Sequence, residues 1–262
     1  MRHSTTFIVA MAAASALAGS AARAATIGDG KFDNGDWSIS TYANGGSSVT
    51  AAQVSAGGNP GFYRLVTDSV GGTGQGVSYS IVAGGNIYTA ALYDPTAQGA
   101  LGPINMSIDS HCRSADGCIG NGEALGFAIL QGGNLYLNEL FDTGNDFAGH
   151  NYIDAGWVTQ AATGLTASDF YLVHVTDTTL VDPTLHPDFS AAGGVMEFGF
   201  TTINSAANSG YGLSVGYDNF QTNVEAFGAQ GGVPEPAAWA LMLLGFGGLG
   251  AALRARGRTV LA

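Results

Sequence analysis

Short runs of apolar or alternating residues, separated by glycine, asparagine and aspartate, recur along most of this chain. Tyr79 and Ile81, and likewise Phe198 and Phe200, fall on alternating positions, as one face of a strand requires. The chain also contains 41 glycines and few strong helix formers, so helices are costly. Strands are therefore predicted near 37–43, 61–67, 76–83, 86–92, 102–109, 124–130, 134–140, 156–160, 170–176, 195–203 and 212–225.

This spacing predicts an all-β fold, a single antiparallel β-sandwich of the jelly-roll type, over 25–230. Two smaller sandwiches or a partial β-helix are the alternatives, but no linker or repeat supports either. The turn sequence Gly-Gly-Asn begins at Gly57, Gly84 and Gly132. At Gly84 and Gly132 it is followed by Ile-Tyr and Leu-Tyr, which predicts a tight hairpin at each.

The charge of the chain is concentrated in an acidic body. The 262 residues carry a net charge of −12, but the segment 26–233 holds only Lys31, Arg64 and Arg113 against 19 acidic residues, a net of −16. Such a surface repels phosphate backbones and attracts cations, so nucleic acid is not an expected partner.

The N-terminus has the organisation of a secretory signal peptide. Arg2 precedes the apolar run Phe7–Ala18, and small residues follow at Ala22 and Ala24. We predict that 1–24 is the signal peptide and that signal peptidase cleaves between Ala24 and Ala25. An uncleaved anchor or a buried helix is the alternative.

The C-terminus contains a run of 17 residues without a charge, 237–253, which is near the lower limit for a membrane-spanning helix. Arg254, Arg256 and Arg258 follow it and should keep the end of the chain on the cytoplasmic side of the inner membrane. The two prolines before the run cannot continue a helix. One C-terminal transmembrane helix is therefore predicted to begin near 237.

The sequence PEPAAWALMLLGFGGLGAALRARGR resembles the PEP-CTERM sorting tail of Gram-negative bacteria, in the variant with Trp239 and Ala240 after the motif. The resemblance implies that the tail, 231–262, is recognised by an exosortase through Pro234, Glu235 and Pro236. It further implies cleavage near this motif and transfer to the cell surface or exopolysaccharide matrix. A plain single-span anchor is the alternative.

Two cysteines, Cys112 and Cys118, flank a short polar loop. Export places them in an oxidising compartment, so a disulfide is predicted. Metal binding with the adjacent His111 is the alternative, although no second Cys/His cluster completes a zinc site.

No catalytic constellation is evident. Ser214 lies in a Gly-x-Ser-x-Gly pattern, but the residues after it alternate like a strand instead of forming the helix that a nucleophile elbow requires. Glu123, Glu139 and Asp142 do not show the alternating carboxylate spacing of sandwich glycosidases. The chain is predicted not to be an enzyme.

The segments GKFDNGDWS, GNGEALGFAILQGGNLYL and GYDNFQTNVEA resemble bacterial jelly-roll carbohydrate-binding and lectin-like modules. The resemblance implies a polysaccharide partner, with Trp37, Trp157, Tyr152 and Tyr211 as candidates for stacking on sugars or for the core. The alternatives are a structural or adhesive surface protein without a defined ligand, and a polysaccharide-active enzyme.

Similar modules often hold calcium where the first and last strands meet. Asp33 and Asp36 lie in the opening segment and Asp218 lies in the closing one, so they are the predicted ligands of a structural calcium ion. Ordinary turn chemistry is the alternative for these aspartates. A second acidic loop, with Asp142 and Asp146, competes for the same role.

Overall fold

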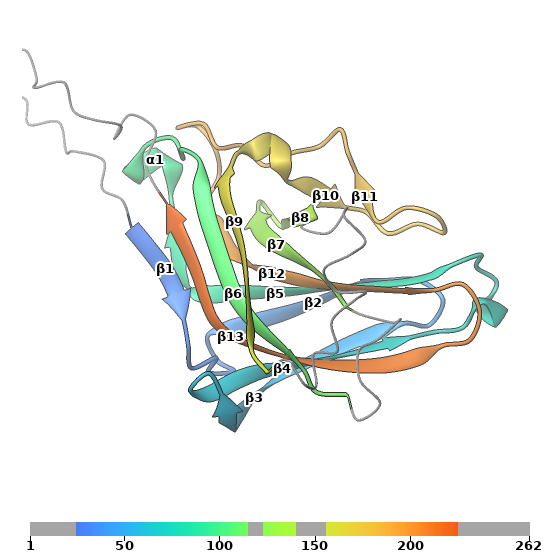
Figure 1. Ribbon diagram of the computed structural model, residues 1–262. Helices are drawn as coiled ribbons and strands as arrows, with labels where there is room; N and C mark the ends of the chain where they lie inside the picture. Colours follow the sequence, from blue (N-terminus) through green and yellow to red (C-terminus); the bar gives the residue numbers. More distant parts are fainter. Residues whose placement is uncertain (1–24, 115–122, 140–155, 225–262) are drawn as a thin grey trace, which may run out of the picture. The chain divides into compact units, whose positions relative to one another are not determined.

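The computed structural model describes residues 25–114, 123–139 and 156–224 (Figure 1). The predicted signal peptide, 1–24, and sorting tail, 231–262, lie outside the described residues. Residues 22–229 form one compact unit, which contains every described strand and the whole described core. Within the described ranges, no helix is long and apolar enough to cross a membrane.

One antiparallel sheet, called sheet A, contains the last strand of the body at its centre. Its order is β3-β4-β13-β6-β9, and β1 also pairs with β13, beyond the end of β4. The strands are β1 (Ala25–Asp29), β3 (Ser48–Gly58), β4 (Gly61–Val70), β6 (Ile104–Cys112), β9 (Val158–Leu165) and β13 (Tyr211–Val224).

The second antiparallel sheet, called sheet B, has the order β11-β10-β8-β7-β12-β5-β2. Its strands are β2 (Trp37–Ala43), β5 (Ser80–Tyr93), β7 (Ala124–Gln131), β8 (Asn134–Glu139), β10 (Tyr171–Val173), β11 (Val181–Asp182) and β12 (Met196–Ala206). The described helices are one short α-helix, α1 (Pro95–Gln98), and the 3-10 turns Thr73–Gln75 and Ala167–Asp169. The prediction of an antiparallel, all-β body is confirmed.

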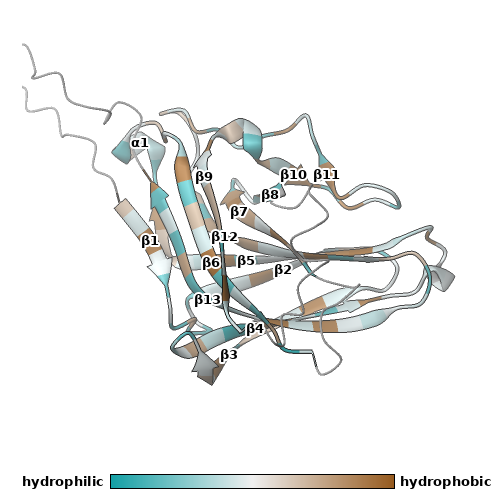
Figure 2. Ribbon diagram, viewed as in Figure 1, coloured by the Kyte–Doolittle hydropathy of each residue, from teal (hydrophilic) through white to brown (hydrophobic). Residues whose placement is uncertain are grey.

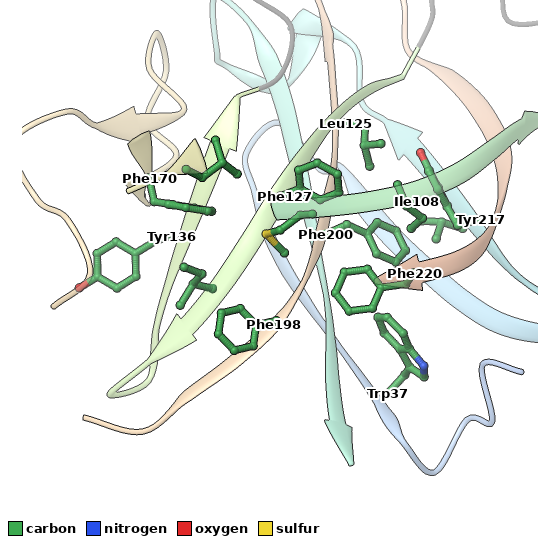
Figure 3. Packing of buried hydrophobic residues seen from close by; sticks show 14 of the residues in the cluster. Trp37, Ile108, Leu125, Phe127, Tyr136, Phe170, Phe198, Phe200, Tyr217 and Phe220 are labelled. Carbon is green, nitrogen blue, oxygen red and sulfur yellow. The ribbon is translucent and has the colours of Figure 1, made fainter. Parts of the chain in front are cut away.

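The main core lies between the two sheets. Phe198 and Phe200 of sheet B and Tyr217 and Phe220 of sheet A are fully buried there, and Trp37 packs against Phe200 and Phe220 (Figure 3). Apolar residues recur along the strands of both sheets, as the sequence pattern predicted (Figure 2). Burial of these aromatic side chains is the main force that joins the sheets.

The predicted hairpin at Gly84 is wrong. Gly84, Gly85 and Asn86 lie in the middle of β5, which runs unbroken from the second half of the predicted strand 76–83 through the whole of the predicted strand 86–92. A Cβ atom on Gly84 would lie 2.7 Å from Thr202 Oγ1, and one on Gly85 would lie 2.6 Å from Leu135 Cδ2. The glycines therefore permit close packing within the sandwich and do not form a turn.

The predicted hairpin at Gly132 is confirmed. Gly132 and Gly133 connect β7 and β8 and both have positive φ, 60° and 81°. Such angles are typical of the two-residue type I′ hairpin turn.

The first described strand begins at Ala25, which is the residue that the predicted signal-peptide cleavage would leave at the N-terminus. Ala25 is the Cα partner of Val224 at the end of β13. The two ends of the described body therefore leave it side by side, where β1 and β13 pair.

Candidate functional site

The outer face of sheet A carries a group of polar and aromatic side chains that contact one another. Ile108 and Cys112 of β6 point into the core. Because strand residues alternate, Asp109 and His111 of the same strand, and Arg113 just after it, point to the opposite face. Tyr63 of β4 reaches this face by the same argument, since Arg64 and Val66 point inward.

Trp157, which directly precedes β9, joins Tyr63, His111 and Arg113 in a cluster. We call these four residues the aromatic patch. The Trp157 ring meets Tyr63 at 5.6 Å and His111 at 5.4 Å between centroids, in edge-to-face contacts. The guanidinium carbon of Arg113 lies 4.7 Å from the Tyr63 ring centroid and 5.0 Å from that of Trp157. These contacts fix the orientation of each ring.

Gly216 makes this packing possible. It lies on β13 as the Cα partner of His111. A Cβ atom at Gly216 would lie 2.9 Å from Cδ2 of Tyr63 and 3.2 Å from Nε of Arg113. Only glycine lets the tyrosine ring and the guanidinium lie this close to the strand.

Arg113 carries the positive charge of the aromatic patch. Its Nη2 donates to the carbonyl oxygen of Gly57 at 2.6 Å. Burial, together with the positive charge of Arg113, lowers the pKa of His111, so this ring is neutral at neutral pH. Within the described part of the chain, Arg113 Nε and His111 Nδ1 are buried without a hydrogen-bond partner.

A group of acidic and amide side chains, the aspartate cluster, adjoins the patch: Asn59, Asp109, Asp218 and Asn219. Asp109 accepts hydrogen bonds from Asn59 Nδ2 at 3.0 Å, from Asn219 Nδ2 at 2.8 Å and from Thr159 Oγ1 at 2.5 Å. Asp218 accepts from the backbone N–H groups of Asn59 and Asn219. Burial raises the pKa of Asp218, and the charges of Asp109 and Asp29 contribute to the increase.

The predicted calcium ligands are not brought together. Asp218 is fully buried in the aspartate cluster, whereas Asp33 is exposed and accepts a hydrogen bond from Gln53 Nε2 at 2.9 Å. Asp36 lies at the end of the same turn, where its N–H donates to the Asp33 carbonyl. No group of three His, Cys, Asp or Glu residues in the described ranges is arranged to hold a metal. Calcium binding at these aspartates stays a prediction.

The four candidate stacking aromatics lie in different surroundings. Trp37 is only 6% exposed and belongs to the core. Tyr211 is half-buried and donates a hydrogen bond to Asn204 Oδ1 at 3.2 Å. Tyr152 lies outside the described residues. Trp157 has the same intermediate exposure as Tyr211, but it is the partly exposed candidate that packs against further aromatic and basic side chains, at the edge of sheet A.

Glu123, considered above as a glycosidase carboxylate, lies inside the sandwich. It forms a fully buried pair with Asp68 of β4. Asn204 Nδ2 donates to Asp68 at 2.7 Å and to Glu123 at 3.4 Å, and the Tyr217 hydroxyl donates to Glu123. Burial raises the pKa of Asp68 to about 6 and raises that of Glu123 well above its usual value. A polysaccharide chain cannot reach this pair.

The other predicted features of the body have mixed outcomes. Ser214 lies within β13, so the rejection of a nucleophile elbow is confirmed. Cys112 is buried at the end of β6, but Cys118 lies outside the described residues, so the disulfide stays a prediction. The side chain of Glu139 and the whole of Asp142 and Asp146 also lie outside the described part.

The outer face of sheet B presents no comparable patch in the described ranges. A second apolar cluster covers it, and Ile87, Ala128 and Leu137 of this cluster are almost completely buried. Leu135 of β8 reaches across to Gly85 of β5. This face is therefore closed by its own side chains.

No family model matches the chain, and no curated protein matches it. Similar solved structures include the family 11 carbohydrate-binding module of the cellulase Lic26A-Cel5E of Clostridium thermocellum. It is 14% identical, with a TM-score of 0.39, over 76% of this chain and 94% of the module. Another is the CBM22-1 xylan-binding domain of Paenibacillus barcinonensis Xyn10C, 13% identical, with a TM-score of 0.32, over 80% of this chain and 99% of the domain. Likeness at this level carries no argument about ligands.

Sequence reasoning identified Trp157 but missed Tyr63, His111 and Arg113 as its neighbours. The signal that was available is the rarity of basic residues, because Arg113 is one of only three in the body. The pairing of β6 with β9 and of β4 with β13, which brings the four side chains together, is not visible in the sequence.

Proposed function

We propose that the chain is an exported, non-catalytic surface module that binds polysaccharide through the aromatic patch. One observation carries the proposal: Trp157 is partly exposed on the outer face of sheet A and fixed by Tyr63, His111 and Arg113. A rigid aromatic ring beside a few polar groups is typical of ligand sites, because the ring supplies apolar area and the polar groups give specificity.

The surroundings of the ring suit a neutral or mildly polar ligand. Sugar rings have apolar C–H faces, which pack on aromatic rings, and hydroxyl groups, which need hydrogen-bond partners. Asn59 and Asn219 of the aspartate cluster, and Thr159 beside it, donate to Asp109. The Thr159 hydroxyl oxygen keeps lone pairs that can accept a hydrogen bond from a sugar hydroxyl. The binding step requires no proton transfer, and the patch contains no nucleophile paired with a base.

Localisation is the second part of the proposal. The signal peptide and sorting tail would carry the module across the inner membrane, anchor it transiently and deliver it to the cell surface or matrix through an exosortase. The pairing of Ala25 with Val224 supports this, because both ends of the described body then lie side by side, and the signal peptide and the sorting tail would leave it at the same place. The alternative role, a structural or adhesive surface protein, is favoured by the uncharged strand edge described below.

Affinity electrophoresis of residues 25–232 in gels that contain bacterial exopolysaccharides tests the proposal. We expect retardation in at least one gel, and we expect Trp157→Ala to abolish it. Tyr79→Ala is the matched control, since Tyr79 is 48% exposed and lies outside the patch. If the wild type migrates equally fast in gels with and without polysaccharide, the proposal of polysaccharide binding is contradicted. Release of reducing sugar from the same polymers would instead indicate an enzyme.

A further inference from the structure

The strand β2 is the last strand of sheet B and has an open edge. On the side of β2 that pairs with β5, Thr89 N donates to the Asp36 carbonyl and Asn44 N donates to the Ile81 carbonyl. The backbone N–H and C=O groups of the even-numbered β2 residues therefore point toward β5. The odd-numbered residues, including Ile39 and Thr41, therefore point their N–H and C=O groups away from the sheet. Within the described ranges, no strand pairs with this edge.

The side chains along this edge lack the usual protection against pairing. Natural edge strands commonly carry charged residues or proline, which prevent a second strand from adding. No charged residue lies between Asp36 and Arg64, and β2 contains no proline. Ile39 is 38% exposed, and Ser40 and Thr41 are also exposed.

The neighbouring edge strand of sheet A, β3, is better protected. The Gln53 N–H, in the middle of β3, donates to Asn34 Oδ1 at 2.9 Å, so a loop occupies the edge there. A bulge between Val54 and Gly58 also interrupts its ladder. The open, uncharged edge of this side of the sandwich is therefore β2.

We propose that β2 is a self-association surface, on which the β2 strand of a second copy of this chain adds antiparallel. The sequence suits two-fold pairing centred on Ser40, because Ile39 then faces Thr41 of the second copy. Both residues direct their hydrogen-bonding groups outward, so the two edges complement each other. Two seven-stranded sheets join into one.

The charge distribution favours a second copy at this edge over other contacts. The segment 26–233 has a net charge of −16, so most approaches between two copies bring acidic residues together. Pairing at β2 places no charge opposite another. Salt screens the remaining repulsion, so association should strengthen as ionic strength rises.

The two-fold register makes a specific covalent test possible. Ser40 would face Ser40 of the second copy in a non-hydrogen-bonded pair, in which Cα atoms are about 4.5 Å apart. This separation lies within the range that a disulfide spans. The full chain carrying Ser40→Cys, exported in its native cell, should therefore form a covalent dimer under oxidising conditions. Thr50→Cys is the control, because Thr50 is exposed on β3 and would not face its own copy.

Light scattering on residues 22–229, which form a compact unit, gives the second readout. We expect twice the monomer mass for the wild type and for Thr50→Lys, and the monomer mass for Thr41→Lys. A monomeric wild type at low and high salt would overturn the proposal. A Thr41→Lys variant that remains dimeric, or a Ser40→Cys chain that cross-links no more than Thr50→Cys, would also overturn it. Polysaccharide binding is not required for any of these outcomes.

Discussion

Stability of the body should fall as pH rises, because of the buried pair Asp68 and Glu123. Both carboxyls are fully buried, and no cation of the described residues contributes to either pKa. Asp68 has a pKa of about 6 in the folded state, against an ordinary value of 3.8 for an exposed aspartate. The folded protein therefore keeps a proton between pH 4 and pH 6 that the unfolded chain releases.

The direction and the size of the change in stability with pH follow from this difference in pKa. Because the folded state binds more protons in this window, the free energy of unfolding decreases as pH rises through it. Two pKa units correspond to about 3 kcal/mol, since one unit is about 1.4 kcal/mol. Glu123, whose pKa is raised further, extends the decrease to higher pH.

Asp68→Asn removes this ionisation. The asparagine oxygen can still accept from Thr202, and its amide can donate to Glu123, with which Asp68 shares a hydrogen bond, but the amide faces that of Asn204. At pH 4 we expect the variant to be less stable than the wild type by about 1 kcal/mol, the net value of one hydrogen bond. At pH 8 we expect it to be the more stable of the two.

Urea unfolding of residues 25–232 at several pH values measures these free energies. Asp33→Asn is the control for the general charge of the acidic body, because Asp33 is exposed. It should keep the pH dependence of the wild type. If wild-type stability is constant or increases from pH 4 to pH 7, the two buried carboxyls do not retain a proton and the reasoning is refuted.

Three further predictions concern the ends and ligands of the body. Replacing Pro234–Pro236 by alanines should leave export intact but trap the chain in the membrane fraction, and unchanged release would refute sorting by this motif. If Cys112 and Cys118 form a disulfide, thiol titration of the unfolded body without reductant should find no free thiol, whereas two thiols would exclude the bond. If Asp218 holds calcium, excess calcium should raise the melting midpoint above that in EDTA. At a calcium concentration a hundredfold above Kd, the folded state should be stabilised by about 2.7 kcal/mol. Equal midpoints would rule the site out.

The sequence predicted the fold well where alternation and turn chemistry agree. The range 37–43 coincides with β2, and 212–225 nearly coincides with β13. In β13 the alternating pattern reports the apolar side that faces the core, whereas in β2 only Trp37 is buried and the strand was predicted from its β-forming residues. The turn at Gly132 and Gly133 could be predicted because glycine, which has no side chain, adopts positive φ angles without a steric clash.

The misses have a common physical cause. The strands β1, β3 and β11 were not predicted, and most β3 side chains are exposed small residues without a clear alternation. Gly84 looked like a turn residue because a sequence does not distinguish glycine chosen for its φ angle from glycine chosen for close packing. Both errors concern properties that depend on the neighbouring strand.

The candidate site was predicted less completely, because its residues meet only through strand pairing. Trp157 lies far along the chain from Tyr63, and Arg113 comes from a third strand region. Asp218 lies in the middle of β13, and its hydrogen-bond partners there are the backbone N–H groups of Asn59 and Asn219. Side-chain identity indicated the chemistry, and only the register between strands determines which groups come together.

Tryptophan fluorescence of residues 25–232 during titration with the native exopolysaccharide tests the central claim most directly. This fragment contains two tryptophans, of which Trp37 is buried in the core and Trp157 lies in the aromatic patch. The account predicts a saturable change in emission that is lost in Trp157→Phe, while the emission of Trp37 stays constant. A change that persists in Trp157→Phe, or binding of the polysaccharide without any change in emission, would contradict it.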